Sequence, residues 1–391
     1  METTEYNMFD DLRPFRDAEI PEAVESLLSD DAFRRALEGF IRPITWAQFT
    51  HTLQQCRTIE DIQRSIVHPL FTGLIDTTTD GCLAEGWEKI SDRQSHLFIS
   101  NHRDIVLDAG LLNILFFRKG FDTTEIAIGD NLLIYPWIRN VVRMNKSFIV
   151  KRGVSVRQIL DVSKHLSEYV YDTVQRREQS VWIAQREGRA KDSNDKTQHS
   201  LLKMFTLYNR SQPLEALKAL RIAPLAISYE FDPCDYLKAK EYQLKRDDAS
   251  YKKTTADDIE NMLTGITGYK GRVMFRFGQP INPRLGQLSE SLDREAVVTA
   301  TADLIDREIY RNYSFFPFNY IAYDLLSGSD RFVSEYTAED KRNFEAYLDK
   351  QVGKIDIEHK DEAFLRGKII EMYGNTVKNR LLANEKQSED S

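Results

Sequence analysis

Cysteine, long apolar runs and excess positive charge are all scarce in this 391-residue chain. The three cysteines, Cys56, Cys82 and Cys234, are widely separated, and their spacing matches neither a metal site nor a disulfide framework, so a reducing cytoplasm is the expected compartment. The formal net charge of -8 at pH 7 argues against nucleic acid as the main partner. The start of the chain is acidic and polar and lacks the layout of a signal peptide.

The longest apolar segments, residues 105–117 and 132–138, are interrupted by Asp108, Asn113 and Pro136. Neither approaches the roughly 20 apolar residues that a membrane-spanning helix needs. Any membrane contact is therefore expected to be peripheral, at the inner face of the membrane. A hydrophobic content of 41% and a charged content of 29% are ordinary for a globular protein.

The apolar pattern divides the chain into three regions. Residues 1–90 carry apolar side chains at three- and four-residue spacings, which predicts a helical N-terminal region. Residues 91–311 alternate short apolar runs with amphipathic segments, which predicts an α/β domain. Residues 312–391 return to a helical pattern, with a tail from residue 381 that is expected to be disordered. We therefore expect an α/β fold with a mostly parallel sheet flanked by helices and with a helical extension at each end.

Within the central region, the predicted strands and helices follow one another closely. The strands are expected at residues 97–99, 125–128, 147–150, 181–184, 223–228 and 272–277, and the helices at 105–118, 155–177, 198–208 and 289–311. Residues 238–258 are rich in charge and predict an exposed insertion. An aromatic cluster at 313–323 predicts a helical lid packed on the domain; the alternative is a surface at the depth of lipid headgroups.

A histidine, His102, follows the first predicted strand directly, and Asp104 and Asp108 lie close behind it. Histidine is the side chain best suited to take a proton near neutral pH, and a neighbouring carboxylate can orient its ring. The alternative is an acidic first helical turn that complements the helix dipole, with His102 as an incidental neighbour. Asp108 is the favoured partner, because Arg103 and Asp104 can pair with each other within the turn.

Cations follow two of the other predicted strands. Lys151 and Arg152 end the strand at 147–150, and arginine is suited to bidentate capture of a phosphate. The strand at 181–184 ends in a turn that contains Arg186, Glu187, Gly188, Arg189 and Lys191. Because the carboxyl ends of parallel strands meet at one edge of a sheet, these groups are expected near His102 and could form a phosphate cradle. The alternative for each is a solvated run of charge.

In this order, these segments resemble the phospholipid and glycerol acyltransferase family. The first motif of that family is a histidine followed a turn later by an aspartate, often with an asparagine before it, and Asn101-His102 matches it. The second is an apolar strand ending in arginine, matched at 148–152. The third is Glu-Gly followed by a basic or small polar residue, matched at 187–189, and the fourth is an apolar strand with a proline, matched at 222–225.

The resemblance covers residues 85–285, with two departures. The family usually has four residues between the histidine and the aspartate, whereas His102 and Asp108 enclose five, which leaves the choice between Asp108 and Asp104 open. The third motif lacks the usual Phe-Pro before its glutamate and has Gln185-Arg186 instead.

The resemblance implies an O-acyltransferase of phospholipid synthesis. His102, oriented by Asp108 or Asp104, is then the base that activates a hydroxyl of a glycerol phosphate or lysophosphatidate-like acceptor. The acyl donor is an acyl thioester of coenzyme A or of acyl carrier protein, with no bound cofactor and no metal. Lys151, Arg152, Arg189 and Lys191 are implied to bind the acceptor phosphate, with Glu187 and Gly188 shaping that turn.

Two other functions stay open. One is an acyltransferase with an acceptor that is not a glycerolipid, and the other is a non-catalytic protein that binds acyl thioesters or lipids with the same fold. A metal hydrolase is disfavoured, because no second histidine with ligand spacing lies close to His102.

Overall fold

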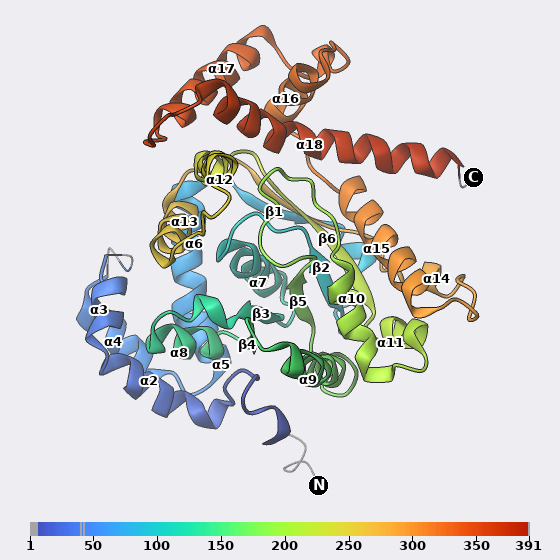
Figure 1. Ribbon diagram of the computed structural model, residues 1–391. Helices are drawn as coiled ribbons and strands as arrows, with labels where there is room; N and C mark the ends of the chain where they lie inside the picture. Colours follow the sequence, from blue (N-terminus) through green and yellow to red (C-terminus); the bar gives the residue numbers. More distant parts are fainter. Residues whose placement is uncertain (1–6, 40, 42–43, 390–391) are drawn as a thin grey trace.

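A computed structural model describes residues 7–39, 41 and 44–389 of the chain (Figure 1). Seven strands form one sheet in the order β1-β7-β6-β2-β5-β3-β4, and every neighbouring pair is parallel except β6 with β7. The strands are β1 (Cys82–Glu85), β2 (Leu97–Ser100), β3 (Glu125–Gly129), β4 (Ser147–Val150), β5 (Val181–Ala184), β6 (Ile222–Tyr229) and β7 (Val273–Phe277). The expected α/β fold, with a mostly parallel sheet flanked by helices, is confirmed.

The six strands expected from the sequence are all present, with bounds that differ by no more than one residue at either end. The strand β1 was not expected, because it falls within the region 1–90, whose pattern predicts helices. It has four residues, pairs only with β7 at one edge of the sheet, and exposes Leu83. An edge strand this short has no apolar alternation by which the sequence could reveal it.

Helices cover both faces of the sheet. Side chains alternate along β2, so that Leu97 and Ile99 join one core with helices α9 and α15, while Phe98 joins the opposite core with α7. The helices of this central part are α7 (Leu107–Lys119), α8 (Pro136–Met144), α9 (Val156–Gln175), α10 (His199–Phe205), α11 (Pro213–Ala219), α12 (Asp235–Asp247), α13 (Thr255–Thr267), α14 (Asn282–Leu285) and α15 (Arg294–Arg311).

The N-terminal helices, drawn in blue in Figure 1, pack against α8 beside the edge strand β4. They are α2 (Ile20–Leu28), α3 (Asp31–Leu37), α4 (Trp46–Gln55), α5 (Ile59–Ile62) and α6 (His68–Thr78), of which α6 also packs on α7 through Ile75. Their shared core includes Phe33 and Phe49 together with Met144 of α8. Short turns lie at η1 (Asn7–Phe9), η2 (Asp17–Glu19), η4 (Trp87–Lys89), η5 (Asp130–Leu132), η6 (Thr206–Asn209) and η7 (Val333–Glu335), and η3 (Gln63–Val67) is a π-helical segment.

The C-terminal helices, at the top of Figure 1, are α16 (Pro317–Ser327), α17 (Ala338–Gly353) and α18 (Glu362–Glu389). They form a core of their own that also takes in Ala239 of α12. The disorder expected from residue 381 onward is wrong for the described residues, because α18 continues to Glu389 and buries Ala383; residues 390–391 lie outside the described part.

The segment 238–258 is not the exposed insertion that its charge predicts. Its first part belongs to α12, where Lys238, Glu241 and Gln243 are all buried. Lys238 is neutralised by Asp232, so a charged side chain is buried at this site without an unpaired charge. Only the part that follows α12 is mostly exposed. No helix in the described part of the chain has the length and hydrophobicity to cross a bilayer.

Candidate active site

The chain that leaves β2 is fixed by Asn101. Its side-chain amide donates to the carbonyl oxygen of Ile227 and its side-chain oxygen accepts from the N–H of the same residue, each at 2.8 Å. Asn101 thereby continues the pairing of β2 with β6 by one position through its side chain. The next residue, His102, lies at the carboxyl end of the sheet, and its ring packs edge-on against Trp182 of β5.

His102 is paired with Asp108. The Nδ1 atom of His102 lies 2.8 Å from Oδ2 of Asp108, which is completely buried, while the histidine side chain is 14% exposed. The same carboxylate oxygen accepts from the backbone N–H groups of Arg103, at 2.6 Å, and Asp104, at 3.1 Å. Because Nδ1 faces a carboxylate, it carries the proton of the neutral ring, and Nε2 is left as the acceptor.

Asp104 bonds to backbone N–H groups at the start of α7. Its Oδ1 atom accepts from the N–H groups of Val106, at 2.9 Å, and Leu107, at 2.8 Å, so it caps the start of α7. Burial, and next the charge of Asp108, raise the pKa of Asp104 above its ordinary value. Of the two aspartates that the sequence leaves open, the structure places Asp108 on the imidazole.

The expected ion pair between Arg103 and Asp104 is wrong. The buried guanidinium of Arg103 instead reaches Oδ2 of Asp195, at 2.6 Å, and the hydroxyl of Ser193, at 2.8 Å. Tyr313 donates to the same Asp195 oxygen at 2.6 Å. Arg103 thus ties the turn that carries His102 to the loop that follows β5. The partner lies 92 positions away in the chain, which is why local pairing predicted the wrong residue.

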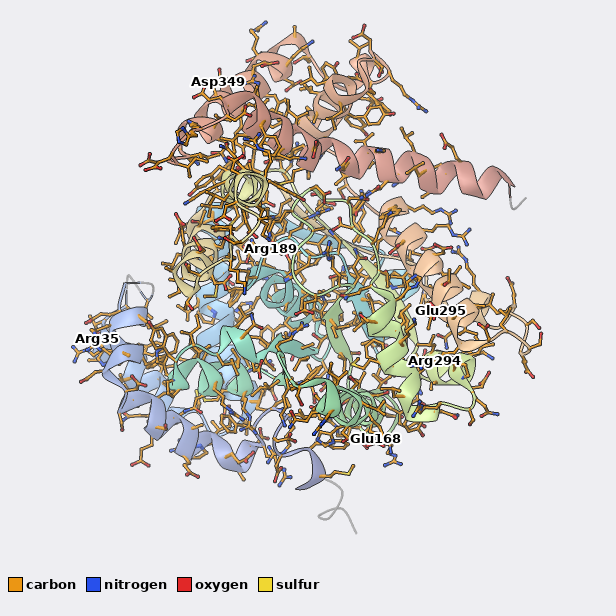
Figure 2. The ribbon with its side chains drawn as sticks, in the orientation of Figure 1. Arg35, Glu168, Arg189, Arg294, Glu295 and Asp349 are labelled. Atoms are coloured by element: carbon orange, nitrogen blue, oxygen red, sulfur yellow. The ribbon has the colours of Figure 1, made fainter. Side chains whose placement is uncertain are left out.

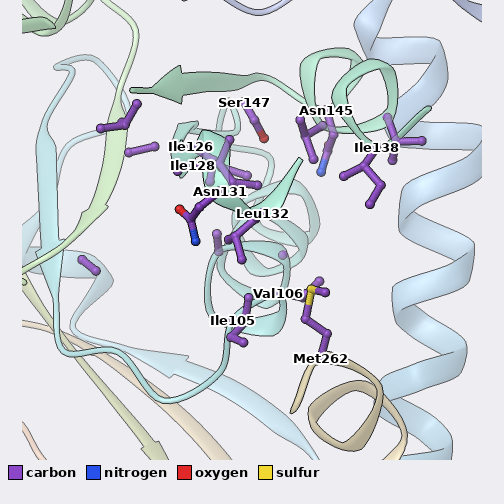
Figure 3. A pocket seen from close by; sticks show the side chains of 18 of the residues that line it. Ile105, Val106, Ile126, Ile128, Asn131, Leu132, Ile138, Asn145, Ser147 and Met262 are labelled. Atoms are coloured by element: carbon purple, nitrogen blue, oxygen red, sulfur yellow. The ribbon is translucent and has the colours of Figure 1, made fainter. Parts of the chain in front are cut away.

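His102 opens into one large cavity of about 1480 Å³. Its wall is mostly apolar and combines the N-terminal helices, through residues such as Phe33 and Leu53, with α9 and α10, through Leu166 and Met204. Figure 3 shows part of this wall, where Val106, Leu132 and Met262 come from three separate parts of the chain. The sequence predicted a helical N-terminal region and did not indicate that its helices would line a site.

The cations expected after β4 and β5 also line this cavity. Arg152 forms an ion pair with Glu187, with 3.0 Å between Nη1 and Oε1, and the backbone N–H of Arg152 donates to Asp130 at 3.0 Å. The second and third motif segments therefore meet, as their positions at the ends of parallel strands predict. Gly188, next to Glu187, has a φ of +68°, a left-handed conformation that a glycine adopts without strain.

Arg189, labelled in Figure 2, lies where the loop after β5 faces α13. Its Nη2 donates to the side-chain oxygen of Asn261 at 2.8 Å, while its Nη1 is buried and has no hydrogen-bond partner among the described residues. A buried guanidinium nitrogen without a partner is uncommon and is well suited to an anionic ligand.

The two lysines of the predicted cradle are already paired. Lys151 forms an ion pair with Asp11 at 2.6 Å and is 41% exposed, whereas Lys191 pairs with the buried Glu241. Both lysines are nevertheless among the residues that line the cavity. In the part of the chain that the structure describes, no group of three or more His, Cys, Asp or Glu side chains is placed to hold a metal ion.

No protein-family description and no curated protein matches the chain. Among solved structures, the chain is similar to the 1-acyl-sn-glycerophosphate (LPA) acyltransferase PlsC from Thermotoga maritima, with 13% sequence identity and a TM-score of 0.37. The match covers 75% of this chain and 96% of that chain.

Proposed function

We propose that this protein is an O-acyltransferase of phospholipid synthesis that moves a fatty acyl group from an acyl thioester to a hydroxyl of a glycerol phosphate or lysophosphatidate-like acceptor. One observation carries the proposal: a His102–Asp108 pair opens into a large apolar cavity that also contains Arg152 and Arg189. A base, an apolar chamber and two guanidinium groups are together what an acyl donor and a phosphorylated alcohol require.

In the proposed reaction, Nε2 of His102 takes the proton of the acceptor hydroxyl while that oxygen attacks the thioester carbonyl carbon. The new C–O bond forms, the C–S bond breaks, and the leaving thiolate takes the proton from the imidazolium. Asp108, whose Oδ2 is 2.8 Å from Nδ1, holds the ring and stabilises its charged form.

A serine nucleophile is not required by this arrangement. Ser100, two residues before His102, donates its hydroxyl to the backbone oxygen of Asn101 at 2.8 Å and accepts from the indole of Trp182 at 3.0 Å. That hydroxyl is committed to the end of β2. Direct attack by the acceptor oxygen is therefore favoured over a covalent acyl-serine intermediate.

The two arginines are proposed to bind the acceptor phosphate. Glu187 holds Arg152 in place, and Arg189 offers its unpartnered Nη1. A phosphate gripped in this way would hold the acceptor hydroxyl near His102, and such positioning accounts for much of the rate of an enzyme without a covalent intermediate. Lys151 and Lys191 contribute charge from the cavity wall.

The apolar wall is proposed to hold the acyl chain of the donor. Coenzyme A and acyl carrier protein are both thioester carriers that leave the acyl chain free to enter it. We propose a cytoplasmic protein that meets its lipid acceptor peripherally, at the inner face of the membrane.

The test is thiol release from palmitoyl-coenzyme A by the purified protein, with glycerol 3-phosphate and then a lysophosphatidate as acceptor, and mass spectrometry of the product. Release that depends on one acceptor and yields its acylated form is expected. Acylation of an alcohol without a phosphate group at an equal rate would show that the natural acceptor is not a glycerol phosphate or a lysophosphatidate. Binding of the donor without any product would make the chain an acyl-thioester-binding protein.

A further inference from the structure

Behind the His102–Asp108 pair, a carboxylate oxygen and a phenol both lack partners. Oδ2 of Asp108 accepts three hydrogen bonds, whereas Oδ1 is buried and has none within the described part of the chain. The hydroxyl of Tyr229 is likewise buried and unpartnered among these residues. Buried polar oxygens without a partner are rare, because each loses its hydration without replacement.

The fold brings these two oxygens to the same place. Along β6, the alternate side chains of Leu225, Ile227 and Tyr229 join the core formed with α7. Tyr229 is the last residue of β6, and Asp108 lies in the first turn of α7. The strand therefore directs the phenol at the N-terminal end of that helix, where the carboxylate is.

The charged surroundings of Tyr229 keep its proton in place. Burial, then the charges of Asp108 and Asp104, raise the pKa of the Tyr229 phenol well above its ordinary value. The third neighbour, Cys82 of β1, has a thiol whose pKa burial raises to about 12, so it is neutral. A phenol beside a carboxylate under these conditions is a donor.

We propose that Tyr229 is a positioning residue, whose hydroxyl donates to Oδ1 of Asp108 and holds that carboxylate in the orientation in which Oδ2 meets His102. The inference rests on the proposed function for its kinetic consequence but not for the contact itself. With Tyr229 in place, both carboxylate oxygens are bonded and the carboxylate cannot rotate away from the imidazole. Tyr229 touches neither the donor nor the acceptor.

The kinetic test is Tyr229→Phe in the full-length protein. A loss of about tenfold in kcat with acceptor KM unchanged within about twofold is expected, because only the base is disturbed. In an Asp108→Asn background, the same substitution should cost no more than about twofold further, since its effect passes through Asp108. An unchanged kcat, or an equal loss in both backgrounds, would overturn the assignment.

A matched control is Tyr169→Phe, which removes another buried hydroxyl, the one that donates to Glu125 in the opposite core. Its kcat should equal that of the parent, so that a general effect of losing a buried hydroxyl is separated from the effect at Asp108. Circular dichroism and thermal unfolding verify that each variant folds.

A second measurement does not depend on activity or on the phenylalanine variant. With 3-fluorotyrosine incorporated at position 229, the ¹⁹F resonance should shift on Asp108→Asn and stay unchanged on Asp11→Asn at the surface. No shift with Asp108→Asn would show that the two groups do not interact. If the shift is present while the parent protein transfers no acyl group to any acceptor, the proposed function fails and the contact stands.

Discussion

Nδ1 of His102 and Oδ2 of Asp108 lie 2.8 Å apart although the residues are six positions apart in the chain. The approach is possible because the chain turns between the end of β2 and the first turn of α7, and Asp104 caps that turn. The same turn places two backbone N–H groups on the Asp108 carboxylate. The proposed base and its proposed orienting group thus come from one short loop.

The two aspartates of this loop should respond differently to the same substitution. Asp108→Asn is expected to lower kcat at least about a hundredfold, because the amide no longer selects the tautomer with a free Nε2. Asp104→Asn should keep kcat within about fivefold of the parent, since asparagine also caps a helix. Steady-state kinetics on both variants checks this, and a larger loss for Asp104→Asn would reverse the assignment of the partner.

The arginines should affect acceptor binding. Arg189→Met is expected to raise the KM for a phosphorylated acceptor by roughly ten- to a hundredfold, because a charge-assisted hydrogen bond to phosphate is lost. Lys218→Met is the comparison, since this side chain pairs with Glu215 and does not line the cavity, and the KM of this variant should change by less than about twofold. Equal effects of the two substitutions would argue against a specific phosphate contact at Arg189.

The apolar cavity should set the length of the acyl chain. Leu70, half-buried in the wall contributed by α6, can be replaced by tryptophan to shorten the space. The ratio of kcat/KM for palmitoyl- over lauroyl-coenzyme A should then fall about tenfold. The control is Leu326→Trp, at an exposed position of α16, which should leave the ratio unchanged. An unchanged ratio in Leu70→Trp would place the acyl chain elsewhere.

The raised pKa of Asp306, in α15, predicts that the stability of the protein depends on pH. Burial, and next the charges of Asp303 and Asp195, raise the pKa of Asp306 to about 7 from 3.8, against the bonds from Thr197 that lower it. At pH values between these two pKa values, Asp306 holds a proton in the folded state and has lost it in the unfolded state. Its contribution to the free energy of unfolding is therefore complete below about pH 4 and is lost as the pH rises through 7.

The measurement is urea unfolding of the parent and of Asp306→Asn at pH 4.5, 6 and 8. The parent should lose stability relative to the variant as the pH rises, by at most about 4 kcal/mol over the full window. A difference between the two proteins that does not change with pH would contradict the raised pKa.

The sequence predicted six of the seven strands of the sheet, including the edge strand β4, and missed the edge strand β1. Strands such as β5 are apolar runs that end in polar turns, and runs of this kind are visible without a partner. The strand β1 was missed because Cys82–Glu85 is recognisable only beside β7. The burial of α12 was missed because a charged segment is expected to be exposed unless the residues that neutralise its charges are known, as Asp232 does for Lys238.

At the candidate site too, features of the local sequence were predicted and contacts between distant segments were not. His102, Arg152 and Arg189 could be predicted because each follows a strand of a parallel sheet, and such ends converge. The partner of Arg103, the cavity wall from the N-terminal helices and the place of Tyr229 depend on tertiary contacts between distant segments, which leave no mark in the local pattern.

The most direct test of the central claim is acyl transfer by His102→Ala compared with the parent, measured together with binding of palmitoyl-coenzyme A to both proteins. We predict that the variant folds and binds the donor with the affinity of the parent, yet has lost thiol release and acylated product by a factor of at least about a hundred. A variant that binds the donor and retains most of the transfer activity would show that His102 is not the base.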